Sequence, residues 1–427
     1  DDECWFLPIF GVYHPKKPKQ IRVVFDSSAQ HHNISLNNVL LTGPDLNNNL
    51  LGVLLRFRKE VFAITVDIQQ MFHCFKVRED YQNFLKFFWF RDSDPTKDVI
   101  EYRMKVYVFG NSPSPAVAIY GLRRAAYEGE DVHGSDTRQF IERHFYVDDG
   151  LVSLPTNDQA VFSKEQERYE RNRTFNCIKL PPTAMLSCKP FLQRNMPRFD
   201  AVPLVQRTLG LCWEIEGDTF TYIVSSINKP FTKLGVLSTV NSIFDPLGMV
   251  SPVTIQSRYA DITTRTFRLH FWDAVLPEEK RKEWETWRDS LQDLKLLHMP
   301  RTYSAVSLSE AKCLELCVIS NASTKAISAV AYFRTIDSDG NSNVRFVLGK
   351  VKLAPQHQPT ISRLELCAVV LAVEIADFIC HEIDLRVNAI KFYCDSNAVL
   401  GYIHNETKRF YVYVHNRVQR IRQSSKI

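Results

Sequence analysis

The stretch FYVDDGLVSL, residues 145–154, constrains this chain most, because two adjacent acids stand between two short apolar runs. Apolar residues 145–147 precede Asp148 and Asp149, and apolar residues 151–152 follow Gly150, which predicts a β-hairpin whose tight turn carries both acids. Two carboxylates at a rigid hairpin tip can bind a divalent cation, but Asp-Gly chemistry also satisfies an ordinary turn. On this stretch alone the ordinary turn is the stronger interpretation, so a metal site requires another acid.

Another acid, Asp67, interrupts the apolar end of residues 61–68, whose β-branched and aromatic side chains predict a buried strand. A lone charge in such a strand is unfavourable unless a partner compensates it. One candidate partner is a divalent cation shared with Asp148 and Asp149, since carboxylates holding two Mg²⁺ ions serve in-line phosphoryl transfer. The alternative is a strand-end aspartate that caps a following helix.

Several motifs in a fixed order carry a resemblance to a known family. They are residues 23–59, the Asp67 strand, residues 102–124 (YRMKVYVFGNSPSPAVAIYGLRR) and residues 146–153 (YVDDGLVS). Their order and spacing resemble the reverse transcriptase of the BEL/Pao retrotransposons, and residues 229–253 are similar to the same family. The resemblance implies an α+β multidomain chain, in which a right-hand polymerase with fingers, palm and thumb precedes an α/β ribonuclease H-like domain.

On this resemblance, residues 1–225 form the fingers and palm, residues 226–305 a helical thumb or connection, and residues 306–427 a C-terminally truncated ribonuclease H-like domain. A chain of 427 residues is long enough for two to four domains, and its net charge of +5 is compatible with nucleic acid. Its ten cysteines form no CxxC pair, which favours reduced thiols in an intracellular protein. The ends of the sequence predict a fragment of a longer polyprotein, with no signal peptide and no apolar run of membrane-spanning length.

The resemblance also implies a binding site for the incoming nucleotide and the template. Arg22 lies in a basic segment and would contact the triphosphate, whereas the neighbouring lysines fit a solvated loop equally well. Phe72 would lie beneath the sugar and exclude a ribose 2′-hydroxyl, although without the family it is interpreted as a core aromatic. Glycine and prolines precede a helix predicted to open at Ala116, an arrangement that exposes N–H groups to a phosphate. The implied set is Arg22, Phe72, Phe109, Gly110, Ser114, Pro115 and Tyr146.

Phe109 stands where the retroviral enzymes have a glutamine, so any hydrogen bond of that glutamine does not transfer to this chain. Lys179 matches the lysine proposed to protonate the leaving pyrophosphate, and a solvated strand lysine is the alternative. Leu209, Gly210 and Leu211 resemble the primer-grip hairpin, although a purely structural hairpin would have the same pattern.

The segment after the hairpins has a helical pattern. Apolar residues at helical spacing alternate with basic ones in residues 229–268, as expected of a thumb that follows a phosphate backbone. A second helix begins at Pro277 and places Trp284 and Trp287 on one face, where core packing is favoured over base stacking.

From about residue 311 the pattern predicts strands at 313–320, 327–336 and 344–353, a helix at 361–383, a strand and a final helix. This order is that of a ribonuclease H-like domain. Glu365 and Asp395 match two of the family's four metal-binding acids, and the fourth would lie beyond Arg420, outside this sequence. The first acid is replaced by Asn321, a weaker ligand for Mg²⁺. Ribonuclease H activity is therefore expected to be weak or absent.

The function implied is that of an RNA-directed DNA polymerase, with Asp67, Asp148 and Asp149 holding two Mg²⁺ ions and Mn²⁺ as the alternative ion. The implied partners are an RNA template, a DNA primer, an RNA–DNA hybrid, deoxynucleoside triphosphates and the rest of the polyprotein, with no membrane. The implied location is the cytoplasm, including virus-like particles, with the nucleus as an alternative.

Two other classes of function stay open. A catalytically decayed retroelement remnant would bind nucleic acid in a salt-sensitive way without incorporating nucleotides. An aspartic peptidase would need an Asp-Thr-Gly or Asp-Ser-Gly loop and a shared-proton aspartate pair, and the nearest strings, residues 26–28 and 337–340, do not provide them.

Overall fold

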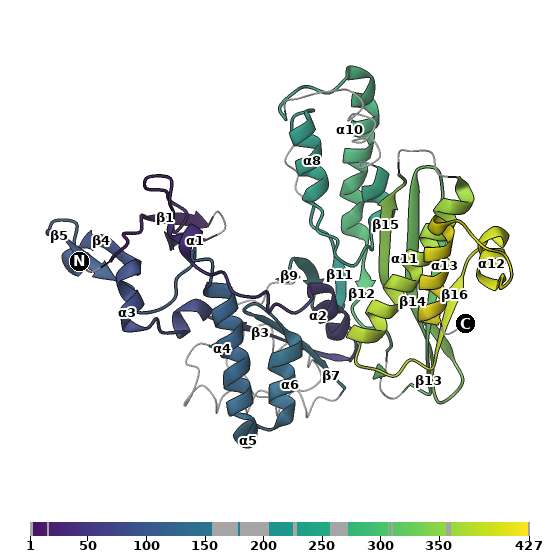
Figure 1. The fold of residues 1–427 in the computed structure, drawn as a ribbon, viewed down its shortest axis with the longest axis horizontal. Helices are drawn as coiled ribbons and strands as arrows, with labels where there is room; N and C mark the ends of the chain where they lie inside the picture. The colour runs from purple at the N-terminus through teal and green to yellow at the C-terminus, as the bar shows by residue number, and fades with distance from the viewer. Residues whose placement is uncertain are drawn as a thin grey trace. The chain divides into compact units, whose positions relative to one another are not determined.

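The computed structural model describes residues 3–14, 17–155, 178–179, 205–224, 229–256, 272–305, 307–308, 311–355 and 360–425 (Figure 1). The chain divides into two compact units. The first unit comprises residues 1–49, 65–151 and 161–181, and the second comprises residues 50–64, 152–160 and 182–427. Both units mix helices and strands. The last part of the predicted helical segment 229–268, from residue 257 on, lies outside the described residues.

The N-terminal part of the first unit is built from two antiparallel hairpins and short helices. Strand β1 (Ile9–His14) pairs with β2 (Lys17–Phe25), and β4 (Lys86–Phe90) pairs with β5 (Val99–Arg103). The short helices are α1 (Leu36–Val39), η1 (Met71–Cys74), α3 (Glu79–Gln82), η2 (Asn83–Leu85) and η3 (Arg91–Ser93). Their shared core contains Leu7, Phe25, Leu36, Val77, Leu85 and Val108.

Three helices lead into the hairpin of residues 145–154: α4 (Ser114–Glu128), α5 (Glu130–His133) and α6 (Ser135–His144). Helix α4 begins two residues before the predicted Ala116, because Pro115 occupies its first turn, where the missing N–H is not needed. The following strands are β6 (Phe145–Tyr146) and β7 (Asp149–Leu154), in a four-stranded sheet of order β6-β7-β3-β8. The other two strands are β3 (Phe62–Ile68) and β8 (Ile178–Lys179), so the predicted Asp67 strand is present.

In the second unit, apolar α2 (Leu50–Phe57) is almost entirely buried. A second sheet has the order β12-β11-β10-β9, from β9 (Val205–Thr208), β10 (Leu211–Glu214), β11 (Thr219–Thr221) and β12 (Met299–Pro300). Helix α8 (Lys233–Asn241) packs against the segment η5 (Glu278–Lys280), α10 (Arg281–Ser290) and η6 (Leu291–Leu296). Trp284 and Trp287 are buried in that packing, which confirms their predicted place in the core.

The C-terminal part of the second unit has the predicted order of three strands, helix, strand and helix. Its sheet has the order β15-β14-β13-β16, and the long helix α11 packs across β13 and β14. An additional helix, α13, packs on α11 and was not predicted. The elements are β13 (Cys313–Ala322), β14 (Ala326–Ile336), β15 (Ser342–Leu353), α11 (Ile361–Glu382), β16 (Ala389–Tyr393), α12 (Asn397–His404) and α13 (Val412–Ser425) (Figure 1).

Within the described residues, all eight cysteines are free, and none of the helices is long and apolar enough to cross a bilayer.

Candidate metal and nucleotide site

The predicted acid hairpin is present, but its turn lies one residue earlier than predicted. Phe145 pairs with Gly150 and Tyr146 with Asp149, so the two turn residues are Val147 and Asp148, and Asp149 opens β7. Val147 has a φ of 58°, a left-handed conformation that is strained for a β-branched residue. The sequence favours the Asp-Asp-Gly string for the turn because aspartate and glycine are typical turn residues, whereas valine is rare in a left-handed conformation. Such strain recurs at functional sites, where the surrounding structure holds it in place.

The three predicted carboxylates lie close together in the first unit. The N–H of Ile68, next to Asp67, donates to the backbone carbonyl of Asp148 at 3.0 Å. Burial raises the pKa of Asp149 from its ordinary value of 3.8 to about 6, with further contributions from the charges of Asp148 and Asp67. Asp67 is exposed on β3, and the other two acids are half-buried. The carboxylates therefore repel one another, and a cation would relieve that repulsion.

Hard oxygen donors of this kind suit Mg²⁺. Among the described residues, no group of three or more His, Cys, Asp or Glu side chains is already gathered as a metal site. The chemistry of the donor set thus fits a divalent ion, while binding would require the carboxylates to turn toward it. Lys179 lies opposite Asp67 in the register of β3 and β8, so its backbone is beside this site.

Three side chains from distant parts of the sequence contact one another in series in the first unit. The guanidinium of Arg22 lies over the ring of Phe109, with 4.7 Å from its carbon to the ring centroid. Phe109 in turn contacts Phe72, with 4.6 Å between ring centroids. Arg22 is exposed, and the two rings are half-buried. Phe109 therefore links Arg22, which is predicted to bind the triphosphate, to Phe72, which is predicted to lie beneath the sugar.

The loop of residues 109–114 is fixed by hydrogen bonds that the sequence did not reveal. The amide of Asn37 donates to the carbonyl of Gly110 at 2.9 Å and accepts from the N–H of Ser112 at 2.8 Å. Gly110 has a φ of 108°, and a Cβ there would lie 2.2 Å from the carbonyl oxygen of Phe25. Ser114 is buried and donates to the carbonyl of Val108 at 2.8 Å, so its side chain holds the loop, whereas Pro115 is exposed.

The predicted primer-grip residues form a tight hairpin in the second unit. Leu209 and Gly210 are the two turn residues between β9 and β10, with φ values of 47° and 87°. Both values are positive, as in the type I′ turn that matches the twist of the two strands. Gly210 is also packed closely, since a Cβ there would lie 2.6 Å from the ring of Phe244. Leu211, the first residue of β10, is buried.

The three predicted ribonuclease H-like residues lie at one end of the C-terminal sheet. Strands β13 and β16 are parallel, and Ile319 pairs with Tyr393. Asn321 and Asp395 each lie two residues beyond that pair, and both are exposed. Glu365, half-buried on α11, follows Leu364, whose buried cluster includes Ala322, the neighbour of Asn321. Of these three predicted site residues, Glu365 and Asp395 are therefore acids, and Asn321 is an amide.

Comparison with known proteins agrees with this architecture. Residues 232–396 match the family model described as Pao retrotransposon-like RNaseH-like domain. This match runs across the predicted boundary between residues 305 and 306, which stays a prediction. A search of curated protein sequences finds no match.

Three similar solved structures are of the foamy viral protease–reverse transcriptase. For the form designated dRH in complex with double-stranded DNA, the TM-score is 0.60 and the identity 15%, over 97% of this chain and 62% of that one. For the complex with an RNA/DNA hybrid, the TM-score is 0.57 and the sequence identity 13%. That match covers 98% of this chain and 49% of the foamy viral chain. For another complex with double-stranded DNA, the TM-score is 0.57 and the sequence identity 15%. That match covers 96% of this chain and 73% of the foamy viral chain. The chain thus spans less than two thirds of the first two proteins.

The fold is therefore a mixed α/β fold of the kind found in retroviral reverse transcriptases with ribonuclease H-like domains. Together, the Pao-type domain and this fold support a fragment of a retroelement polyprotein.

Proposed function

We propose that this chain is an RNA-directed DNA polymerase of a BEL/Pao-like retroelement. The observation that carries the proposal is the grouping of Asp67, Asp148 and Asp149, in which burial and the two neighbouring charges raise the pKa of Asp149 to about 6. Carboxylates arranged so that they repel one another are typical of sites that bind cations. The first unit would then contain the fingers and much of the palm, and α8 and α10 of the second unit the thumb.

In this proposal, the three acids hold two Mg²⁺ ions, which when bound would neutralise the phosphates and favour ionisation of the primer 3′-hydroxyl. Arg22 binds the triphosphate, and Phe109 supports its guanidinium from below. Phe72 packs against the other ring and lies beneath the sugar, so the site excludes a 2′-hydroxyl. Lys179, opposite Asp67 in the sheet, donates a proton to the leaving pyrophosphate.

The double-stranded DNA and RNA/DNA hybrid in the foamy viral complexes support nucleic-acid partners for this chain. The Leu209–Gly210 turn would position the primer strand, because its rigid type I′ geometry presents a fixed backbone. The ribonuclease H-like domain would bind the hybrid with little or no cleavage, since Asn321 lacks the charge of an acid.

Primer extension on an RNA template, with Mg²⁺ and deoxynucleotides, tests the proposal. The parent protein should extend the primer, and Asp148→Asn should not, while both bind template–primer equally. A matched control is Asp80→Asn, which removes an exposed acid whose partner is the neighbouring Arg78. Extension by Asp148→Asn at the parental rate would overturn the assignment of the site. Binding without extension by the parent would favour a decayed nucleic-acid-binding remnant.

A further inference from the structure

A fully buried arginine, Arg301, lies directly after β12 in the second unit. Its Nε and Nη2 donate to the two carboxylate oxygens of Asp218 at 2.7 and 2.8 Å. Nη1 donates to the carbonyls of Phe57 and Glu60 at 2.7 and 2.9 Å, and Nη2 also donates to that of Val61 at 2.7 Å. These bonds use all five N–H donors of the guanidinium.

A second buried arginine, Arg58, joins the same segment to the ribonuclease H-like sheet. Its Nε donates to the carbonyl of Arg301 at 2.9 Å, and its two terminal nitrogens donate to the carbonyls of Val347 and Phe346 at 3.1 and 2.8 Å. The guanidinium also lies over the ring of Tyr303, at 4.4 Å from the centroid. Two guanidiniums thus add hydrogen bonds to the aromatic packing of Phe57, Trp213 and Tyr303 at this junction.

The carbonyls that Arg58 binds are available because of an irregularity in β15. The register between β14 and β15 shifts between Phe346 and Leu348, so Val347 is an extra residue that forms a β-bulge. A bulge leaves backbone groups outside the regular ladder, and these groups need partners when they are buried. Arg58 supplies those partners, so the bulge and the arginine fit each other.

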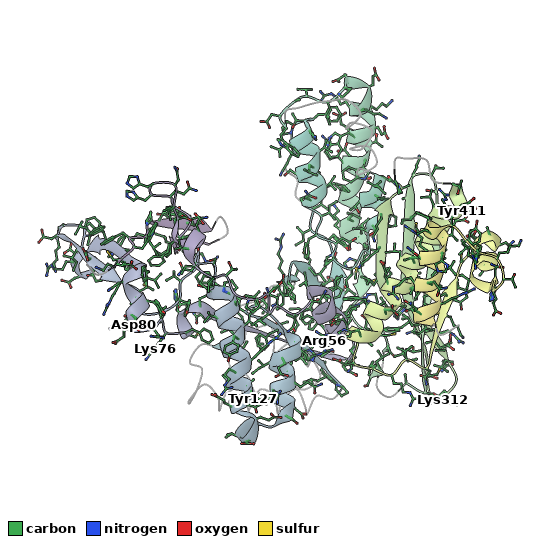
Figure 2. The ribbon with its side chains drawn as sticks, in the orientation of Figure 1. Arg56, Lys76, Asp80, Tyr127, Lys312 and Tyr411 are labelled. Carbon is green, nitrogen blue, oxygen red and sulfur yellow. The ribbon has the colours of Figure 1, made fainter. Side chains whose placement is uncertain are left out.

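Arg301 binds carbonyls of the segment that immediately precedes β3, the strand that carries Asp67, and Arg58 is itself part of that segment. Residues 50–64 belong to the same compact unit as the ribonuclease H-like domain. Helix α2 is joined to that domain by a third buried arginine, Arg56 (Figure 2), which donates to the carbonyl of Glu382 at 2.9 Å and pairs with its carboxylate at 2.5 Å. The start of β3 is therefore fixed by the ribonuclease H-like domain and the β9–β12 sheet.

We propose that Arg58 and Arg301 are positioning residues for the polymerase reaction, and that the ribonuclease H-like domain serves as a scaffold for the strand carrying Asp67. This inference rests on the proposed function for its kinetic consequence. Arg301 fixes the carbonyls of residues 57, 60 and 61, and Arg58 joins the same segment to β15, so the start of β3 is held on the second unit. Polymerisation then depends on this domain whether or not it cleaves RNA.

Lysine substitutions test this role without removing the charge. Lysine carries one compact ammonium with no planar fork, so Arg301→Lys cannot bind Asp218 through two atoms and the three carbonyls together. The rate of nucleotide incorporation in a single turnover should fall at least about tenfold in Arg301→Lys and Arg58→Lys. The Mg²⁺ concentration for half-maximal rate should rise several-fold, and template–primer affinity should stay within about threefold.

The matched control is Arg334→Lys, which alters an arginine of the same domain that pairs with Glu315 at 2.8 Å and does not bind residues 57–61. Asp218→Asn serves as a milder variant, because it keeps the shape of the partner of Arg301 while removing its charge. If every folded variant incorporates nucleotides at the rate of the parent protein and with the same Mg²⁺ dependence, the positioning role is overturned. A purely structural role would lower stability without changing the Mg²⁺ dependence.

Hydrogen–deuterium exchange separates failure of this inference from failure of the proposed function. Amides of residues 62–68 should exchange at least about tenfold faster in Arg301→Lys than in Arg334→Lys, whether or not the parent polymerises. Unchanged exchange in this strand would overturn the scaffold role directly. Faster exchange in Arg301→Lys, combined with a parent protein that extends no primer, would retain the scaffold role and reject the polymerase.

Discussion

The acid hairpin of the first unit and the ribonuclease H-like end of the second unit would serve the same metal chemistry, yet they differ in construction. At the hairpin, three carboxylates lie together, and the pKa of Asp149 is raised to about 6 by burial and by the two other acids. At the ribonuclease H-like end, the predicted site residues are two acids, Glu365 and Asp395, and an amide, Asn321. The strands at this end pair in a regular register with an amide at Asn321, and that amide contributes no charge toward a cation.

The backbone also differs between the two ends. The hairpin is strained at Val147, and Gly150 is packed so closely that a Cβ would lie 2.4 Å from a methyl group of Val66. The ribonuclease H-like end is formed by regular strands, and Asn321 is an exposed residue of β13. Strain and close packing thus accompany the site that retains all its predicted acids.

The largest expected effect is at Asp67. Asp67→Asn should lower primer extension on the order of 10³-fold, the size of losing a main electrostatic contribution to a transition state. Single-turnover incorporation measures the effect, with Asp80→Asn as the control. Loss of less than about tenfold would mean that Asp67 does not belong with the hairpin acids.

The next effect tests the close packing of the hairpin. Gly150→Ala should lower the free energy of unfolding by about 1–3 kcal/mol, because the added methyl group displaces Val66. Urea unfolding measures the change. Gly401→Ala in α12 is the control, because a Cβ there meets nothing within 4 Å and alanine favours a helix. If Gly150→Ala and Gly401→Ala changed the free energy of unfolding equally, the hairpin would not be more closely packed than α12.

At the other site, restoring the acid should restore part of its affinity for cations. Asn321→Asp should tighten Mn²⁺ binding about tenfold, or roughly 1.4 kcal/mol, because a carboxylate replaces a neutral amide beside Asp395 and Glu365. Titration in an Asp148→Asn background limits the contribution of the hairpin site. Asn343→Asp, in β15 at the opposite end of the sheet from Asn321, adds the same charge elsewhere. Equal tightening by both variants would indicate a general charge effect.

The smallest effect concerns metal-free protein. The pKa of Asp149 is higher in the folded state than its ordinary value of 3.8, so the ionised carboxyl lowers stability above about pH 6, and this loss disappears as the pH falls toward 4. Asp149→Asn should therefore raise the free energy of unfolding in EDTA at pH 8 on the order of 1 kcal/mol, after allowance for solvent screening. A gain of the same size at pH 4 and pH 8 would contradict this assignment.

Much of the fold follows from local patterns. Alternating apolar residues predict β13 to β16, and the apolar periodicity of residues 361–383 predicts α11. Helix α13 was missed because its sequence, VYVHNRVQRIRQSS, is mostly polar, and only Val418 and Ile421 are buried. The turn of the acid hairpin was placed one residue too late, because tertiary packing holds Val147 in a conformation that its own preference disfavours.

The sites were predicted less completely, because proximity across the sequence leaves no local signal. The family resemblance implies Arg22, Phe72 and Phe109 separately, and only the folded unit shows that they contact one another through Phe109. Arg58 and Arg301 were not predicted at all, because arginine in a sequence indicates a solvated surface until its acceptors are known. Their acceptors are mostly backbone carbonyls, which every sequence possesses.

One assay tests the central comparison most directly. An RNA–DNA hybrid with one label on the RNA and another on a recessed DNA primer reports polymerisation and RNA cleavage in the same tube, with Mg²⁺ and deoxynucleotides present. We expect extended DNA and intact RNA, with extension lost in Asp148→Asn. Cleaved RNA beside an unextended primer would contradict it, because the site with the amide would then be the active one.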